Sequence, residues 1–331
     1  MRWFLQLHGD RPLDDYPRLA ARAEELGFED VTVHDVLLRR PVWPVLCDVA
    51  RATSRVLVGP NVTHPWLTHP IQLAANVRHL DDVSQGRAVC GIGRGSMYDL
   101  TRRDNPSSLA GLREAIDVIN ALSTGSGDGV DGTHFAVAEG ARLQFGTPRR
   151  IPIWLGSLGP RGAEFAGRHA DGLRVAAQWA PDYALHLQQA LQRGALEAGR
   201  DPSDVDLVVE NWTCVHPDRD RARHDARVLL SAFLPDMGPL IRYHGIPDRE
   251  VAAAIEVSRH GRTSEVSVIS DRTVDLFMAA GDDDDLRRGL RRLIDAGLET
   301  ISFSGRLGPD TDQALELIGA AITDLQTTVR S

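Results

Sequence analysis

No lysine occurs anywhere in the 331-residue chain, so all 37 basic residues are arginine. This absence excludes every mechanism that needs a lysine amine, such as a Schiff base, a lysine general base or a Walker-type phosphate loop. With 46 acidic residues the formal net charge is 37 − 46 = −9, which argues against nucleic acid as a partner. Arginine must therefore supply any cationic side-chain contact to an anionic ligand.

Cysteine and long apolar runs are also scarce. The three cysteines, Cys47, Cys90 and Cys214, lie far apart, without the paired spacing of a zinc site or a redox dithiol. An odd number of cysteines in a chain of this length favours a reducing compartment. The apolar stretch at the N-terminus is too short for a signal peptide, and no run approaches the length of a membrane span. We therefore expect a cytoplasmic protein without a membrane partner.

Short β-branched runs alternate with amphipathic helices along the whole chain, as in buried parallel sheets. Strands are expected at residues 2–8, 30–34, 55–60, 87–92, 151–156, 172–176, 204–214 and 299–304. Helices between them stop at glycine, as at Gly27 and Gly297, directly before a new strand. About eight such units in series predict a (β/α)8 TIM barrel. A doubly wound sheet is the alternative, but residues 91–95 lack the spacing of its dinucleotide-binding turn.

Two stretches exceed a minimal barrel. Residues 125–150 begin with four glycines, at residues 125–132, followed by two short β-like runs, which predicts a hairpin-like excursion. Residues 235–270 are expected to form a helical insertion with a loop. Neither stretch is long enough to form a separate domain, so we expect a single domain over residues 1–331.

In a barrel of this kind, functional residues gather at the carboxyl ends of the strands. That rule selects the segments 34–35, 59–65, 91–96, 156–162 and 304–309. Four of the five are rich in glycine and three contain arginine. Backbone N–H groups at a helix N-terminus, together with arginine, suit a phosphate or a carboxylate. The simpler interpretation of any one such loop is that its glycines permit a tight turn.

Two other kinds of site are weaker interpretations. His64, His69 and His79 have no acidic residue placed to complete a metal site, so no metal is expected. A Ser-His-Asp hydrolase built on Ser96 or Ser157 lacks the G-x-S-x-G turn after a strand.

Segments along most of the chain carry a family resemblance. In order, they are residues 23–30, 52–63, 80–87, 91–95, 151–157, 170–172 and 307–310. Together they resemble the bacterial-luciferase-like superfamily of flavin and deazaflavin enzymes, and within it the methylenetetrahydromethanopterin reductase-like branch that uses coenzyme F-420. The resemblance implies a luciferase-like (β/α)8 barrel that transfers a hydride between the deazaflavin and a small organic substrate. A monooxygenase that uses flavin mononucleotide (FMN) is the alternative, and a flavin-binding protein without catalysis is a third.

The resemblance also implies where the coenzyme lies. Its ring would lie against Asn61 and Val62, where family members often have a non-prolyl cis peptide bond, and its phosphate tail would meet the N–H groups of Leu158 and Gly159. The implied coenzyme-binding residues are Asp35, Asn61, Val62, Thr63, Gly93, Arg94, Gly95, Ser96, Gly156, Ser157, Leu158, Gly159, Arg161 and Arg306.

The chain departs from the family pattern at two proton-handling positions. Enzymes of this branch often carry Asp-His after the second strand, whereas here Val36 follows Asp35 and His34 precedes it. An acidic residue often stands where this chain has Ser96. We expect Asp35 and His34 to be the catalytic residues, with Asp35 the more important. His34 can donate a proton only if its ring turns into the mouth, and otherwise water is the donor.

The resemblance further implies a homodimer formed through the second and third helices. Trp43, Val45, Leu46 and Val49 give the second helix an apolar face, which otherwise packs only on its own barrel. Residues 236–246 are expected to form a lid that shapes substrate choice.

Overall fold

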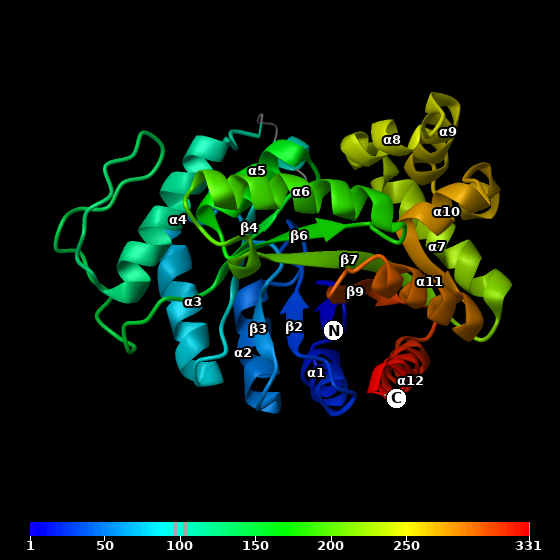
Figure 1. Cartoon of the computed structure of the whole chain (residues 1–331), viewed down its shortest axis with the longest axis horizontal. Helices are drawn as coiled ribbons and strands as arrows, with labels where there is room; N and C mark the ends of the chain where they lie inside the picture. Colours follow the sequence, from blue (N-terminus) through cyan, green and yellow to red (C-terminus); the bar gives the residue numbers. More distant parts are fainter. Residues whose placement is uncertain (96–97, 102–104, 331) are drawn as a thin grey trace. The chain divides into compact units, whose positions relative to one another are not determined.

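The computed structural model describes residues 1–95, 98–101 and 105–330, and the chain divides into two compact units. The larger unit comprises Leu5–Arg174 and Ala190–Asp206. The smaller unit comprises Met1–Phe4, Val175–Gln189 and Leu207–Ser331. Strands and helices alternate along both units (Figure 1).

In the larger unit, short parallel strands follow one another in chain order. They are β2 (Asp30–Val33), β3 (Leu57–Pro60), β4 (Cys90–Gly93) and β5 (Ile153–Gly156), while β1 (Arg2–Leu7) and β6 (Gly172–Ala176) extend through both units. Val33 is in register with Pro60, and Gly93 with Gly156. Isolated bridges, such as the one between Thr63 and Ile92, join β3 to β4.

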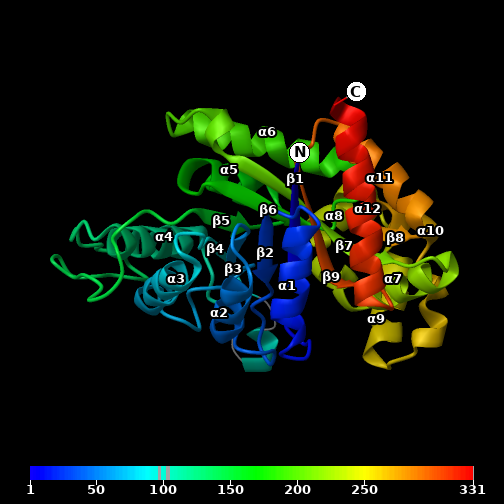
Figure 2. The same ribbon diagram turned by 90° about the horizontal axis from the view of Figure 1, so that it is seen from below.

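Amphipathic helices cover these strands. They are α1 (Asp15–Glu25), α2 (Val42–Ala52), α3 (Pro70–Ser84), α4 (Leu109–Thr124), α5 (Pro160–His169) and α6 (Pro181–Glu197), the last extending through both units, with 3-10 turns η1 (Tyr98–Thr101) and η2 (Pro202–Asp204). Ser108 caps α4 by accepting a hydrogen bond from Gly111 N at 3.0 Å. Figures 1 and 2 both show α2 and α3 side by side.

The smaller unit is built on β7 (Asp206–Val215), β8 (Met278–Gly281) and β9 (Thr300–Leu307). Its helices and 3-10 turns are α7 (Arg219–Phe233), η3 (Leu234–Asp236), α8 (Gly238–His244), α9 (Asp248–Arg259), η4 (Thr263–Val268), α10 (Asp271–Phe277), α11 (Asp283–Asp295) and α12 (Thr311–Arg330). Strand β7 pairs in parallel with β9, and near its end with β8.

The hydrogen-bonded strand order is β3-β2-β1-β9-β7-β6-β5-β4, with β8 beside β7. Because bridges also join β3 to β4, the order returns to its start, which is the strand order of the predicted (β/α)8 barrel. Strand β8 was not predicted from the sequence. Its residues, Met-Ala-Ala-Gly, include no β-branched side chain, and burial in the sheet makes them a strand.

Both expected excursions are present. Val130 and Val137 exchange backbone hydrogen bonds of 2.9 Å as an antiparallel bridge. The Glu114 carboxylate of α4 holds the turn by accepting N–H groups of residues 133–135, the closest at 2.6 Å. In the second stretch, α8, α9 and η4 form the helical insertion. That residues 1–331 form a single domain stays a prediction.

A buried ion pair lies inside the larger unit. Arg174 Nη2 on β6 is 2.8 Å from Asp30 Oδ2 on β2, and neither side chain is more than 1% exposed. The guanidinium also lies 4.2 Å from the centre of the Trp154 ring. Because side chains alternate along a strand, the face of β2 that carries Asp30 also carries Thr32, and His34 follows two residues later.

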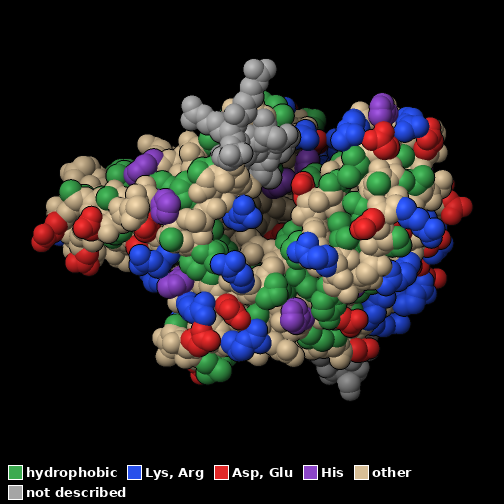
Figure 3. Space-filling model, turned by 90° about the horizontal axis from the view of Figure 1, so that it is seen from above, with side chains coloured by type: hydrophobic (Ala, Val, Ile, Leu, Met, Phe, Trp, Pro, Cys, Tyr) green, Lys and Arg blue, Asp and Glu red, His purple; other side chains and the backbone are tan. Residues whose placement is uncertain are grey.

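The surface combines both signs of charge. Figure 3 shows arginine side chains beside acidic ones over much of one face. Buried Arg223 also pairs with the exposed Asp271, at 2.6 Å. No helix among residues 1–95, 98–101 and 105–330 is long and apolar enough to span a membrane.

Candidate active site

Hydrogen bonds to β1 and β2 fix the segment that follows β3. The peptide bond between Asn61 and Val62 is cis, which confirms that expectation. Asn61 N donates to the Val33 carbonyl of β2 at 2.9 Å, and Gln6 Nε2 of β1 donates to the Asn61 carbonyl at 2.6 Å. Sequence reasoning missed Gln6, although a lone polar residue inside an apolar strand was a usable signal.

The Val62 side chain packs against the backbone of two glycines, Gly93 and Gly156. A Cβ on Gly93 would lie 2.7 Å from Val62 Cγ2, and one on Gly156 would lie 2.8 Å from Val62 Cγ1. Thr63 N donates to the Gly91 carbonyl, and Gly93 N donates to the Thr63 carbonyl, both at 2.9 Å. The glycines at the ends of β4 and β5 therefore make room for Val62 and fix the segment at the strand ends.

Asp35, the second residue after β2, faces this segment. Burial raises the pKa of its carboxyl, while a hydrogen bond from the Thr63 hydroxyl and the charge of His64 act in the opposite direction. Burial lowers the pKa of His64, which Asp35 partly offsets. The two groups therefore act on each other electrostatically, and each favours the charged form of the other. His64 was considered only as a metal ligand in the sequence, and its interaction with Asp35 was missed.

His34 lies beside a second histidine. The ring centroids of His34 and His8 are 5.4 Å apart, so the His34 ring turns toward the residue that follows β1. Burial, together with the positive charges of His8 and Arg39, lowers the pKa of His34 to about 3. His34 is therefore neutral at physiological pH. The strand-end rule, applied to β1 as well, would have selected His8.

Hydrogen bonds fix the first two residues of the loop after β4. Exposed Arg94 donates through Nε to Ser107 Oγ at 2.8 Å. Asn105 Nδ2 donates to the carbonyls of Arg94 at 3.3 Å and of Gly95 at 3.4 Å. The predicted site residue Ser96 lies outside the described residues.

The turn after β5 presents the start of α5. Gly159 is the N-cap residue and provides no side-chain hydrogen bond to the first turn, and a Cβ on it would meet nothing within 4 Å. Ser157 N donates to the Arg174 carbonyl at 3.2 Å, and Arg161 in the first turn is exposed. The open N-terminus of a helix favours an anion, so this turn fits a phosphate group.

The predicted residues of the larger unit thus fall at the ends of β2 to β5. Asn61, Val62, Thr63, Gly93 and Gly156 form one contiguous group, with Leu158 in the next turn. Arg306 belongs to the smaller unit, where it is the exposed residue of β9. Its place in the coenzyme site stays a prediction.

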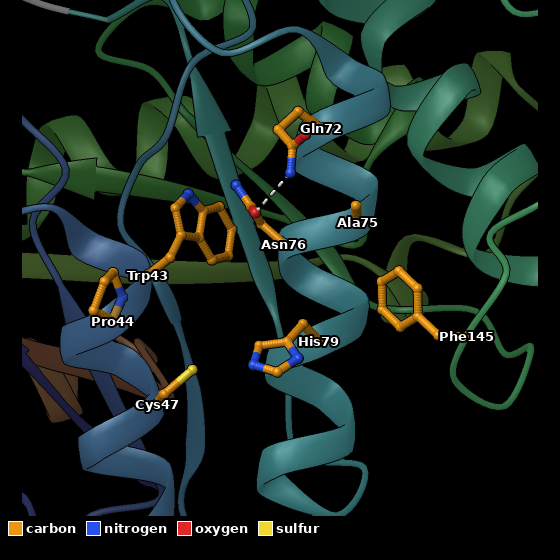
Figure 4. A pocket seen from close by; sticks show the side chains of 8 residues that line it. All are labelled: Trp43, Pro44, Cys47, Gln72, Ala75, Asn76, His79 and Phe145. Carbon is orange, nitrogen blue, oxygen red and sulfur yellow. Dashed lines mark hydrogen bonds between the residues drawn. The ribbon is translucent and has the colours of Figure 1, made fainter.

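A groove of about 470 Å³ lies between α2 and α3, on the helices and not at the strand ends (Figure 4). It is lined by Trp43, Pro44, Cys47, Gln72, Ala75, Asn76, His79 and Phe145. Among the described residues, no three His, Cys, Asp or Glu side chains cluster as metal ligands.

These features define a barrel with glycine-containing turns at its strand ends. The chain belongs to the luciferase-like monooxygenase family, whose model matches residues 2–300. It is 29% identical over 320 residues to 5,10-methylenetetrahydromethanopterin reductase of Archaeoglobus fulgidus, covering 94% of both chains. It is 28% identical over 318 residues to the F420-dependent glucose-6-phosphate dehydrogenase of Microbacterium testaceum, covering 91% of this chain and 89% of that one.

A solved structure agrees. The coenzyme F420-dependent tetrahydromethanopterin reductase from Methanopyrus kandleri superposes with a TM-score of 0.85 at 25% identity, covering 96% of this chain and 97% of that one. The luciferase-like (β/α)8 barrel and the family resemblance predicted from the sequence are therefore confirmed. The relatives are F420-dependent oxidoreductases of this family.

Proposed function

We propose that the protein is a coenzyme F-420-dependent oxidoreductase that transfers a hydride between the deazaflavin and a small organic substrate. The F-420-dependent relatives, which match more than nine-tenths of the chain, carry this proposal. Val62, backed by two glycines at the strand ends, supports it because it offers a firm surface to a flat ring. The FMN-dependent monooxygenase is the weaker alternative.

The strand ends fit such a coenzyme. The segment from Asn61 to Thr63 would hold the ring, and the open start of α5 would hold the phosphate tail. Arg161 and Arg94 are exposed cations beside these turns, and each suits an anionic tail. When bound, the coenzyme supplies or accepts a hydride, so the chain's own residues must orient the substrate and handle the accompanying proton.

Asp35 and His34 are proposed as the catalytic residues, with Asp35 the more important. Asp35 has a raised pKa and touches Thr63 of the ring-binding segment, so it can orient the coenzyme or the substrate. Neutral His34 can donate or accept a hydrogen bond, but the proton of the reaction needs a different source because the pKa of His34 is about 3.

We also propose a cytoplasmic homodimer. Val45, Leu46 and Val49 are buried within their own chain, which leaves Trp43 and the groove beside it for a second copy. Phe145, 44% exposed, extends this apolar surface. The three free, buried cysteines fit a reducing compartment. A monomeric mass by light scattering at micromolar concentration would contradict the dimer, and Trp43→Ala should weaken it.

Hydride-transfer assays test the reaction class. With oxidised F-420 and glucose 6-phosphate, or reduced F-420 and 5,10-methylenetetrahydromethanopterin, the coenzyme absorbance should change without oxygen uptake. Oxygen consumption with reduced FMN, and no change with either F-420 probe, would favour the monooxygenase.

A further inference from the structure

The loop after β1 carries a histidine that a carboxylate holds in one orientation. His8 Nδ1 lies 2.8 Å from Asp10 Oδ1, and the two side chains are 12% and 16% exposed. The other carboxylate oxygen of Asp10 lies 3.3 Å from Arg39 Nη1. A carboxylate that accepts the Nδ1 proton of a histidine favours the tautomer whose Nε2 can take up a proton, and it stabilises the imidazolium that forms.

The same loop is fixed to its neighbours within the chain. Tyr16 Oη of α1 donates to the His8 carbonyl at 2.9 Å and accepts from Arg11 N at 3.2 Å. A Cβ on Gly9 would lie 3.1 Å from the His34 carbonyl oxygen, so the loops after β1 and β2 meet at a glycine. These contacts hold the His8 ring in place without help from a ligand.

His34 completes the arrangement but differs in its electrostatics. Its ring centroid is 5.4 Å from that of His8. Burial lowers the pKa of His34 to about 3, an effect that His8 and Arg39 reinforce and Asp10 opposes. Of the two neighbouring imidazoles, therefore, only His8 has a carboxylate partner to support a positive charge.

We propose that His8, oriented by Asp10, donates and accepts the proton of the hydride-transfer reaction, with His34 as its neutral neighbour. This inference rests on the proposed function and adds the residue that handles the proton. The proposed proton donor thus follows strand β1, whereas Asp35 follows strand β2. The other charged and titratable groups around the pair are Arg39, which acts on His34 and contacts Asp10, and Tyr16, on which Arg11 and Arg40 act in turn.

The proton balance is the same in both directions. In the reducing direction, the substrate carbon gains a hydride and its oxygen or nitrogen takes the proton from His8 Nε2, after which neutral His8 takes a proton from water. In the oxidising direction, the substrate loses a hydride and a proton, and Nε2 accepts the proton. When bound, reduced F-420 would supply the hydride in the reducing direction, and oxidised F-420 would accept it in the oxidising direction.

Histidine NMR of the full chain tests the pair without turnover. Two-bond ¹H–¹⁵N spectra, assigned with His8→Gln and His34→Gln, are recorded from about pH 5 to 9. We expect His8 to carry its proton on Nδ1 and to take up a second one as the pH falls, while His34 stays neutral. Adding F-420 should move the His8 titration by roughly half a pH unit or more. A protonated His34 in this range, or a His8 signal that F-420 leaves unchanged, overturns the proposal.

Turnover of the two F-420 probes named above adds a second readout. His8→Gln should lower kcat by about 100-fold or more and remove one limb of the pH profile, with Asp10→Asn losing about tenfold. The Kd for F-420 should stay within about threefold, and exposed His260→Gln is the matched control. An unchanged pH profile in His8→Gln overturns the proposal. Failure of the wild type to bind F-420 contradicts the proposed function instead, and the NMR titration of the coenzyme-free protein still decides the state of His8.

Discussion

Val62 Cγ2 lies so close to the backbone of Gly93 that a Cβ on Gly93 would be 2.7 Å away. Real Cβ atoms do not approach a methyl group that closely, so an alanine there must displace Val62 and the cis segment that carries it. The ring-binding surface thus depends on a residue that contributes no side chain.

Gly93→Ala should therefore weaken F-420 binding by about tenfold or more and cost about 1–3 kcal/mol of stability. Fluorescence titration and urea unfolding measure the two effects. The matched control is Gly238→Ala, since a Cβ there would meet only the far end of the Arg242 side chain, at 3.3 Å. Unchanged binding in Gly93→Ala would show that Val62 does not support the ring.

The start of α5 offers a sharper test of the phosphate site. Gly159 has extended backbone angles, φ −129° and ψ 157°, which suit an acidic N-cap residue. Gly159→Asp should keep or raise the Tm, because the carboxylate caps the helix, yet weaken F-420 binding by about tenfold through charge repulsion. If Gly159→Asp binds F-420 as well as Gly159→Ala does, the phosphate tail lies elsewhere.

The buried pair of Asp30 and Arg174 should matter for stability. Arg174→Met removes the cation that faces the buried Asp30 carboxylate and should cost about 3–5 kcal/mol in urea unfolding. The double variant Asp30→Leu/Arg174→Met should recover much of this loss, because two apolar side chains need no partner. A single variant as stable as the wild type would contradict the buried charge pair.

Asp35 should trade stability for activity. The pKa of Asp35 is raised in the folded state, so folding favours its protonated form. The resulting contribution to the free energy of unfolding is fully present below the ordinary carboxyl pKa and is lost as the pH rises through the raised value. Asp35→Asn should thus be more stable than the wild type at pH 7, with the gap closing below about pH 4. Its kcat should fall by about tenfold or more while F-420 still binds. A wild-type kcat in Asp35→Asn would remove this residue from the catalytic set.

His34 makes the opposite prediction for acid stability. Its pKa falls from 6.5 to about 3 on folding, so the unfolded chain takes up a proton in this window and the folded chain does not. Stability should therefore decline as the pH drops below about 6.5, by at most about 1.4 kcal/mol per pH unit. In His34→Gln this decline should be absent, which unfolding at stepwise lower pH will measure. Parallel profiles for both proteins would show that His34 titrates normally.

Much of the fold followed from local patterns. Buried β-branched runs and helices that stop at Gly27 and Gly297 located most of the strands, because periodicity and glycine caps act over a few residues. Strand β8 escaped prediction because its residues have little intrinsic preference for a strand and adopt one beside β7.

The candidate site was only partly predictable. Segments such as Asn61–Thr63 could be selected because function gathers at strand ends, and the resemblance added the cis bond. Pairings across the fold could not be selected. Asp30 and Arg174 are 144 residues apart, and Gln6 and Asn61 are 55 apart, so only the folded chain brings them together. The same holds for His8 and His34, which face each other from separate loops.

The central claim is that the strand ends bind a deazaflavin. Titration of the purified protein with F-420 and with FMN, side by side under identical conditions, tests it most directly. We expect a Kd for F-420 at least about tenfold below that for FMN, a difference of about 1.4 kcal/mol. Equal dissociation constants, or tighter binding of FMN, would contradict it.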